Sequence, residues 1–337
     1  MRFALTAEQR EFRDAVDSLL RDADGIAAAR AWAGGDTKPG LAIWRGLAAI
    51  GLHALAGEYP VELCAALERI GYHAAPGPYP ESLAVTAALA AAGEGTPRPA
   101  EGTTAAATSH APDADTAGHR ILTADSSPLA PLAAEWLPRL TEGVIATTAV
   151  PPEAPYAPNA DIADLCLPAI SSRPGGSEAV PSLDPTRTLF PVTAAPPSPD
   201  LIFDTAALLT AAQLLGLGRA ALDLTVAYAK QRVQFGRPIG EYQAVKHRLA
   251  DAHTALEFAR PLVFAAALST APPDISAAKA SASEAAYRAA RAALQLHGAI
   301  GYTDEYDLSV HFKKIRALYS AWGDPSFHRD RLLRSPR

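Results

Sequence analysis

The sequence contains only two cysteines, Cys64 and Cys166, among its 337 residues. Two cysteines cannot build a disulfide framework, so we interpret them as core residues of a cytoplasmic protein with reduced thiols. Charged residues make up only 20% of the chain and the net charge is −6, which excludes a dedicated nucleic-acid-binding protein. Four histidines show no spacing typical of a metal site; these are His247, His253, His297 and His311.

Membrane and export signals are also missing. No apolar run approaches the length that we expect of a membrane-spanning helix. Residues Met1–Glu8 contain no apolar segment of the kind found in signal peptides. Hydrophobic residues, in contrast, make up 49% of the chain, which supplies a core and excludes disorder over the whole length.

Proline divides the sequence into three zones. Residues 98–203 hold more than half of the 29 prolines, which block helix interiors and central strands. Short apolar pieces remain there and predict a small β-domain, with a disordered linker as the alternative interpretation. The predicted strand pieces are Arg120–Thr123, Val144–Val150, Ile162–Leu167, Leu189–Thr193 and Leu201–Phe203.

The two flanking zones, 1–97 and 204–337, show apolar residues at helical spacing. Thr6 is placed to cap the first helix, with Gln9 three residues later. Residues 204–337 contain four long helical runs joined by short connections, which predict an antiparallel bundle. We expect Pro261 to kink or end the second of these helices. The predicted fold is therefore mainly α with a small β-domain, arranged as helices, then strands, then helices.

One junction between bundle helices carries side chains with binding chemistry. Arg232 offers five fixed donors suited to a phosphate, and Phe235 offers a flat apolar surface. The amide of Gln243 can both donate and accept. Together they suit a phosphate-bearing cofactor with an aromatic ring. The alternative, which these residues alone favour, is a capped helical hairpin with a surface arginine.

A second junction lies at residues 295–306. Gly298 and Gly301 allow a close approach to the backbone, and a helix is predicted to begin near Thr303. Free N–H groups at such a helix start can bind an anion. The alternative is a glycine-terminated helix followed by a capped restart.

Both junctions in this order resemble the C-terminal domain of the acyl-CoA dehydrogenase family. The family element R-x-x-F-G-x-x-I-x-x-x-Q is matched by Arg232, Phe235, Gly236, Ile239 and Gln243. The element Q-x-x-G-G-x-G-Y-x-x-E-Y is matched by Gln295, Gly298, Gly301, Tyr302, Glu305 and Tyr306, with Ala299 at the second glycine.

The resemblance implies an N-terminal helical domain over 1–97, a reduced β-barrel-like middle domain over 98–203 and a four-helix bundle over 204–337. It also implies FAD as cofactor and fatty or steroid acyl-CoA thioesters as substrates. In this family a carboxylate removes the α-proton while a hydride passes to the flavin. The bundle motifs hold the nucleotide end of an FAD bound mainly by a neighbouring subunit. Carried over, the cofactor-binding residues are Arg232, Phe235, Gln243, Gln295 and Gly298.

The sequence departs from the family where the flavin ring and the base belong. Prolines replace the small and hydroxyl residues of the middle-domain loop at Thr147–Tyr156. The two usual positions of the catalytic glutamate hold Trp322 and Ala206, and neither side chain accepts a proton. Asp324 is the nearest carboxylate, but in Gly-Asp-Pro-Ser an N-cap is favoured over a displaced base.

The chain is therefore most like the smaller, incomplete subunit of actinobacterial heteromeric acyl-CoA dehydrogenases. The resemblance implies an α2β2 heterotetramer in which a complete subunit supplies the base and the flavin pocket. Two alternatives stay open. One is a self-sufficient homo-oligomeric dehydrogenase with Asp324 as base, and the other is a non-catalytic scaffold of the same fold.

Overall fold

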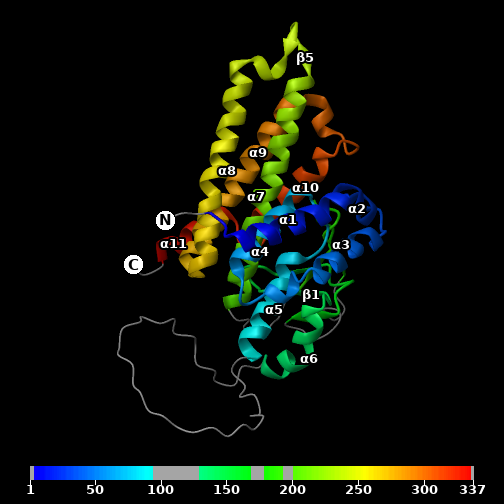
Figure 1. Cartoon of the computed structure of the whole chain (residues 1–337), viewed down its shortest axis with the longest axis vertical. Helices are drawn as coiled ribbons and strands as arrows, with labels where there is room; N and C mark the ends of the chain where they lie inside the picture. Colours follow the sequence, from blue (N-terminus) through cyan, green and yellow to red (C-terminus); the bar gives the residue numbers. More distant parts are fainter. Residues whose placement is uncertain (1–3, 94–128, 168–177, 193–199, 335–337) are drawn as a thin grey trace.

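The first part of the chain is helical, as its apolar spacing predicts. The computed structural model describes residues 4–93, 129–167, 178–192 and 200–334 (Figure 1). Thr6 and Gln9 form the predicted capping box, in which each side chain bonds the other residue's backbone N–H. The N-terminal helices are α1 (Ala7–Asp22), α2 (Gly25–Ala33), α3 (Lys38–Ala49), α4 (Pro60–Tyr72) and α5 (Tyr79–Gly93).

The described residues of the middle part contain a helix and four three-residue strands. The helix is α6 (Ala130–Thr141); the strands are β1 (Ala146–Thr148), β2 (Tyr156–Pro158), β3 (Leu165–Leu167) and β4 (Leu189–Pro191). In the described residues β1 pairs with β3 in parallel, and β2 pairs with β4 antiparallel. Three predicted strand pieces are thereby confirmed in shortened form, because the neighbouring prolines limit each ladder.

Two other strand predictions have different outcomes. Leu201–Phe203 is not a strand, because it lies in the first turn of α7, where Ile202 and Phe203 are buried. A three-residue apolar run has no period that separates a strand from a buried helix. Arg120–Thr123 lies outside the described residues.

The C-terminal part forms the predicted bundle. Its helices are α7 (Asp200–Gln231), α8 (Gln243–Ser269), α9 (Pro272–His297) and α10 (Leu308–Ser320), followed by the shorter α11 (Pro325–Arg334). Helix α8 continues through Pro261 rather than ending there. Helix α7 begins four residues before the predicted bundle start at 204 and runs along the long axis of the molecule (Figure 1).

Helix α7 connects the bundle to the N-terminal helices. Among the described residues it is the helix long and apolar enough to cross a membrane, contrary to the expectation from the sequence, but 89% of its most apolar window is buried inside the protein. One hydrophobic core contains residues of α1, α4, α5, α7, α8 and α9. The apolar character of α7 is therefore explained by burial on several sides.

Two glycines allow α7 and α4 to cross at backbone contact. A Cβ at Gly216 of α7 would overlap the carbonyl oxygen of Glu68, and a Cβ at Gly71 of α4 would overlap that of Gln213. Side chains larger than hydrogen at these positions would push the helices apart. The crossing therefore fixes the bundle against the N-terminal helices.

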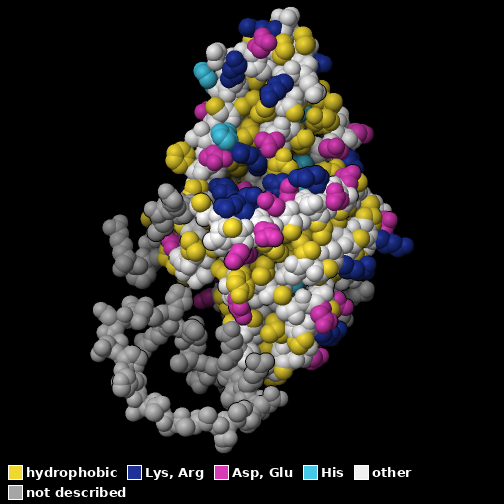
Figure 2. All heavy atoms as spheres, in the orientation of Figure 1, with side chains coloured by type: hydrophobic (Ala, Val, Ile, Leu, Met, Phe, Trp, Pro, Cys, Tyr) yellow, Lys and Arg dark blue, Asp and Glu magenta, His cyan; other side chains and the backbone are white. Residues whose placement is uncertain are grey.

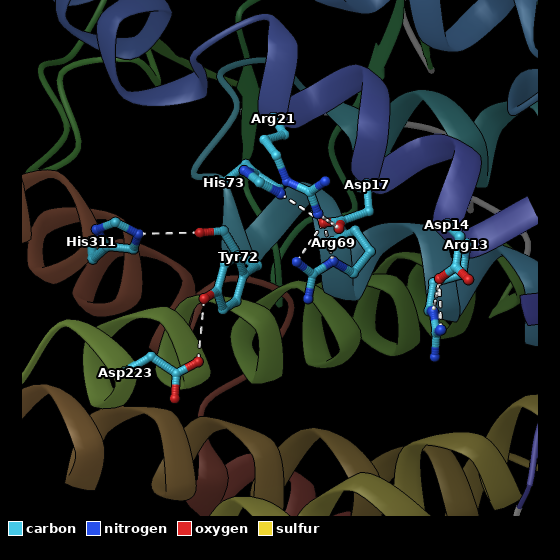
Figure 3. A network of polar contacts seen from close by, with 9 residues as sticks. All are labelled: Arg13, Asp14, Asp17, Arg21, Arg69, Tyr72, His73, Asp223 and His311. Carbon is cyan, nitrogen blue, oxygen red and sulfur yellow. Dashed lines mark hydrogen bonds and ion pairs between the residues drawn. The ribbon is translucent and has the colours of Figure 1, made fainter. Parts of the chain in front are cut away.

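Polar contacts surround this crossing (Figure 3). Asp17 of α1 accepts hydrogen bonds from Arg69 Nε at 2.7 Å and from His73 Nε2 at 2.8 Å. Burial by itself raises the pKa of Asp17, but the hydrogen bonds from His73 and Arg69 outweigh it and lower the pKa below its ordinary value. The hydroxyl of Tyr72 donates to Asp223 of α7 at 3.2 Å, which ties the end of α4 to the bundle.

The surface on this side is rich in charges of both signs. Figure 2 shows Lys and Arg side chains next to Asp and Glu side chains in a band across the middle of the face. Two ion pairs of 3.0–3.1 Å, Arg260–Glu68 and Arg219–Glu257, join α8 to α4 and α7. Such exposed pairs contribute little stability singly, so the glycine crossing and the core determine the arrangement.

We expect Gly216→Ala to lower the free energy of unfolding by about 1–3 kcal/mol, because the new methyl group overlaps the α4 backbone. The matched control is Gly46→Ala in α3, where the new methyl meets only the flexible Leu19 side chain at 3.0 Å. We expect this control to change stability by less than about 1 kcal/mol. Urea unfolding followed by circular dichroism measures both, and equal effects of the two substitutions would contradict the role of the crossing.

Candidate functional site

The junction between α7 and α8 is a β-hairpin that the sequence pattern did not predict. Strands β5 (Val233–Gln234) and β6 (Arg237–Pro238) pair antiparallel at one end of the bundle (Figure 1). The two turn residues, Phe235 and Gly236, have φ of 53° and 84°. Positive φ at both central positions is the type I′ geometry that suits a two-residue hairpin. The turn leaves the Phe235 side chain 93% exposed at the tip.

The two predicted binding junctions meet at the same end of the bundle. The ring of Tyr228, one turn before Arg232, stacks on the ring of His297 with 4.2 Å between centroids. His297 is the last residue of α9 and directly precedes Gly298. Ring stacking therefore brings the end of α7 beside the end of α9.

Each predicted cofactor-binding side chain at this end is exposed; these are Arg232, Phe235, Gln243 and Gln295. The Arg232 guanidinium has no hydrogen-bond or ion-pair partner in the described part of the chain. Gly298 adopts φ 62°, and the space where its Cβ would stand has no atom within 4 Å. A free guanidinium, two amides and an uncovered backbone suit a nucleotide with its phosphates. Their role in binding FAD stays a prediction.

The two positions that usually carry the catalytic glutamate are both buried and lack a carboxylate. Ala206 lies inside α7, and Trp322 is only 3% exposed between α10 and α11. The indole Nε1 of Trp322 donates to Glu81 Oε1 at 3.1 Å. Phe203 packs edge-on against the indole ring, with centroids 5.9 Å apart. The tryptophan therefore fills this place with a ring that donates and does not accept a proton.

Glu81 is a buried carboxylate that sequence reasoning missed. It lies in the first turn of α5 and is 2% exposed. Its Oε1 accepts from the indole of Trp322 and from Arg187 Nη2 at 3.0 Å. Its sign in the sequence was a single acidic residue near the start of an otherwise apolar helix. Glu81 is compensated by a cation and an indole N–H, which is the arrangement that keeps a buried charge tolerable.

Lys279 of α9 holds the backbone around Trp322 in place. Its fully buried Nζ donates to the carbonyl oxygens of Leu318, Tyr319 and Gly323 at 3.1–3.3 Å and lies 3.0 Å from Ser283 Oγ. Burial lowers the pKa of Lys279 to about 7. These bonds satisfy carbonyls at the end of α10 and fix the turn into α11.

Asp324 is used as a helix cap. Its Oδ1 accepts from the backbone N–H of Phe327 at 2.8 Å, at the start of α11, and its side chain is exposed. This is the N-cap interpretation that Gly-Asp-Pro-Ser favours. The contact gives Asp324 a structural role that needs no catalytic function.

The loop after β1 offers few free backbone donors. Val150 and Ala154 exchange both of their N–H···O bonds, at 2.7 and 2.8 Å. Prolines at 151, 152 and 155 have no N–H, so Glu153 is the remaining donor between 150 and 155. The polar edge of a flavin ring needs several such donors, and this described loop does not fit it.

Comparison with known proteins finds similarity in the C-terminal part of the chain. Residues 201–335 match the profile "Acyl-CoA dehydrogenase, C-terminal domain". These residues, which form the helical bundle, are therefore similar to that domain. Acyl-CoA dehydrogenase IpdE2 of Mycobacterium tuberculosis is 42% identical over 191 residues, which cover 54% of this chain and 57% of IpdE2. IpdE2 of Mycolicibacterium smegmatis is 37% identical over 201 residues, covering 57% of this chain and 64% of the relative. The chain thus spans less than two thirds of either curated relative in these matches.

Solved structures share the fold of this chain over nearly its whole length. The chain superposes on a chain of the Tcur3481–Tcur3483 steroid ACAD G363A variant with a TM-score of 0.74, at 23% identity and 96% coverage of both chains. It also superposes on a chain of the ChsE4–ChsE5 complex from Mycobacterium tuberculosis with a TM-score of 0.74, at 19% identity over the full length of both. The predicted helical domains and small β-domain are thereby confirmed as a fold that this chain shares with these structures.

We expect acid to destabilise the turn that carries Trp322, through His328. His328 Nε2 lies 2.8 Å from the Trp322 carbonyl oxygen, and its Nδ1 is buried without a partner among the described residues. Burial lowers the pKa of His328 to about 4, against an ordinary value of 6.5. The unfolded chain therefore binds more protons between these two values, and stability falls as the pH drops from 6.5 to 4.

His328→Gln keeps a donor and removes the titration. We expect the variant to lose less stability between pH 6.5 and 4.5, by at most about 1.4 kcal/mol per pH unit. Urea titrations at both pH values measure this slope. The control is His253→Gln, since His253 is half exposed; a slope that His328→Gln leaves unchanged would count against the assignment.

Proposed function

We propose that this chain is the non-catalytic half of a two-chain, FAD-dependent acyl-CoA dehydrogenase. The partner subunit holds the flavin ring and supplies the base that removes the α-proton of an acyl-CoA thioester. Bound FAD would accept the hydride from the β-carbon. This chain contributes the exposed end of its bundle to the nucleotide part of that FAD, through Arg232, Phe235, Gln243, Gln295 and Gly298.

The observation that carries the proposal is the buried indole of Trp322. A dehydrogenase of this family needs a carboxylate facing the thioester α-carbon. Here one of the two usual positions is occupied by a ring that is locked onto Glu81 at 3.1 Å and braced by Phe203. The other position is the methyl group of Ala206. In the proposed enzyme the base therefore comes from another chain.

The C-terminal end of α7 supports a role toward a partner. Arg232, directly after this end, carries a charge that nothing in the described residues neutralises. The stacking of Tyr228 on His297 brings the second junction beside it. The loop after β1 lacks the donors that this chain would need for a flavin ring of its own. Side chains for the nucleotide are thus retained, while those for the ring and the base are absent from the usual positions.

The relatives support the same division of labour. Two of the superposed structures are titled as pairs, ChsE4–ChsE5 and Tcur3481–Tcur3483, and the second is called a steroid ACAD. We extend this to an α2β2 heterotetramer here, and we name steroid side-chain CoA thioesters as candidate substrates beside fatty acyl-CoA.

Co-expression with a complete acyl-CoA dehydrogenase subunit tests the proposal. We expect the isolated chain to purify with little FAD and the heteromer to carry stoichiometric FAD and to desaturate acyl-CoA. Absorbance at the flavin bands and size-exclusion chromatography measure these quantities. Full flavin loading and turnover by the isolated chain would overturn it.

We expect Arg232→Ala to weaken FAD retention by the heteromer at least tenfold, because a charge-assisted hydrogen bond contributes about 1.5–3 kcal/mol. Dialysis followed by flavin titration gives the dissociation constant. The matched control is Arg45→Ala, an exposed arginine of α3 without a partner among the described residues. If Arg232→Ala leaves FAD content and activity untouched, the chain is a scaffold rather than a cofactor-binding subunit.

A further inference from the structure

A groove with a volume of about 840 Å³ lies between α8 and α9. Its lining includes Arg248 and Asp251 from α8, and Tyr287, Arg288 and Arg291 from α9. Apart from Gln295 at its end, it uses none of the residues predicted to bind FAD.

The groove carries excess positive charge. Arg248, Arg288 and Arg291 are exposed and have no ion-pair partner among the described residues. Asp251 is the one carboxylate in the lining that is not already paired, since Glu284 is bound by Arg329. Arg288 and Arg291 lie one turn apart on the same side of α9, where like charges repel. An acidic surface placed on this groove would relieve that repulsion.

The same face continues into an apolar patch. Phe258 lies seven residues after Asp251, two turns further along α8, and is 76% exposed. Leu262 follows one turn later on the same side of α8 and is 41% exposed. An apolar patch next to a charged groove is the composition of a protein interface rather than of a small-ligand site.

Helix α9 presents one continuous stripe to this face. Six of its non-buried positions recur at helical spacing; these are Ala277, Ser281, Glu284, Arg288, Arg291 and Gln295. The stripe begins with small residues and ends at a residue predicted to bind the FAD nucleotide. The face is therefore continuous with the surface where a partner subunit is already expected.

A second copy of this chain does not fit the face. If two copies pair with their α8 helices parallel, the arginines of one groove meet the arginines of the other. If they pair antiparallel, each set of arginines is desolvated against Phe258 and its apolar neighbours without a counter-charge. Both arrangements work against self-association.

We propose that the α8–α9 face docks a pair of helices of the partner subunit that carries Asp and Glu side chains opposite Arg248, Arg288 and Arg291. Apolar side chains of the partner cover Phe258 and Leu262 in the same contact. This inference rests on the proposed function, since it requires the partner. The charge of the groove then selects the hetero-oligomer over the homo-oligomer.

Charge reversal tests this surface. We expect R288E/R291E to weaken the heteromer at least tenfold, measured by sedimentation of the mixed subunits at 0.1 M salt. The control is K38E/R45E, the same charge change on exposed residues of α3; it should alter the dissociation constant less than twofold. Raising the salt to 0.5 M should weaken the unmodified heteromer and should not weaken an R288Q/R291Q heteromer further. Circular dichroism confirms that each variant is folded.

Each other result overturns the inference in a distinct way. A fully loaded, active heteromer formed by R288E/R291E would reject the docking surface and leave the proposed function standing. Failure of the unmodified chain to form any heteromer would reject both. Dimerisation of the isolated chain that R288E/R291E abolishes would show self-pairing instead. Thermal stabilisation of the isolated chain by 1 mM inorganic pyrophosphate, lost in R288E/R291E, would show a small-anion site.

Discussion

The close crossing of α4 and α7 is the constraint on which the rest of this structure depends. Gly71 and Gly216 let the two backbones touch, so α7 lies against the N-terminal helices at one end and inside the bundle along the rest of its length. The crossing therefore determines the positions of Ala206 and Phe203 near the start of α7, and of Arg232 directly after its end. A wider crossing would shift both ends relative to α5 and to the turn that carries Trp322.

Near the N-terminal end of α7, the position that usually carries the catalytic base is part of the protein interior. Trp322, Glu81 and Arg187 come from three separate segments of the chain, and their polar groups pair with one another. Lys279 fixes the adjoining backbone. Removing one member of such a buried set leaves an uncompensated charge or donor. At the C-terminal end of α7, in contrast, charged and aromatic side chains are exposed to solvent. One end of α7 is therefore buried in the protein, and the other end leads to an exposed surface.

Local sequence signals predicted what depends on local structure. The capping pair Thr6 and Gln9, the four bundle helices and the cap at Asp324 follow from residues a few positions apart. The type I′ hairpin was missed because Phe235 is an unusual residue at positive φ. Leu201–Phe203 was misassigned because its burial comes from tertiary contacts.

Contacts between distant residues could not be predicted from one sequence. Glu81 and Trp322 are 241 positions apart, and the pairing of their polar atoms follows from the fold alone. The positions of Trp322 and Ala206 came from a family resemblance rather than from any period in the chain. In the sequence, the arginines of the α8–α9 groove look like an ordinary solvated helix face. The structure adds that no acidic side chain among the described residues forms an ion pair with them.

The shared core has a consequence for how this protein can change during evolution. The matched family profile begins at residue 201, inside the first turn of α7, yet this helix packs against α4 and α5 as well as against α8 and α9. A gene fusion or recombination event that separated the chain at residue 201 would expose a long apolar side of α7 to solvent. The leading helices and the bundle must therefore be inherited together, as a single unit of descent.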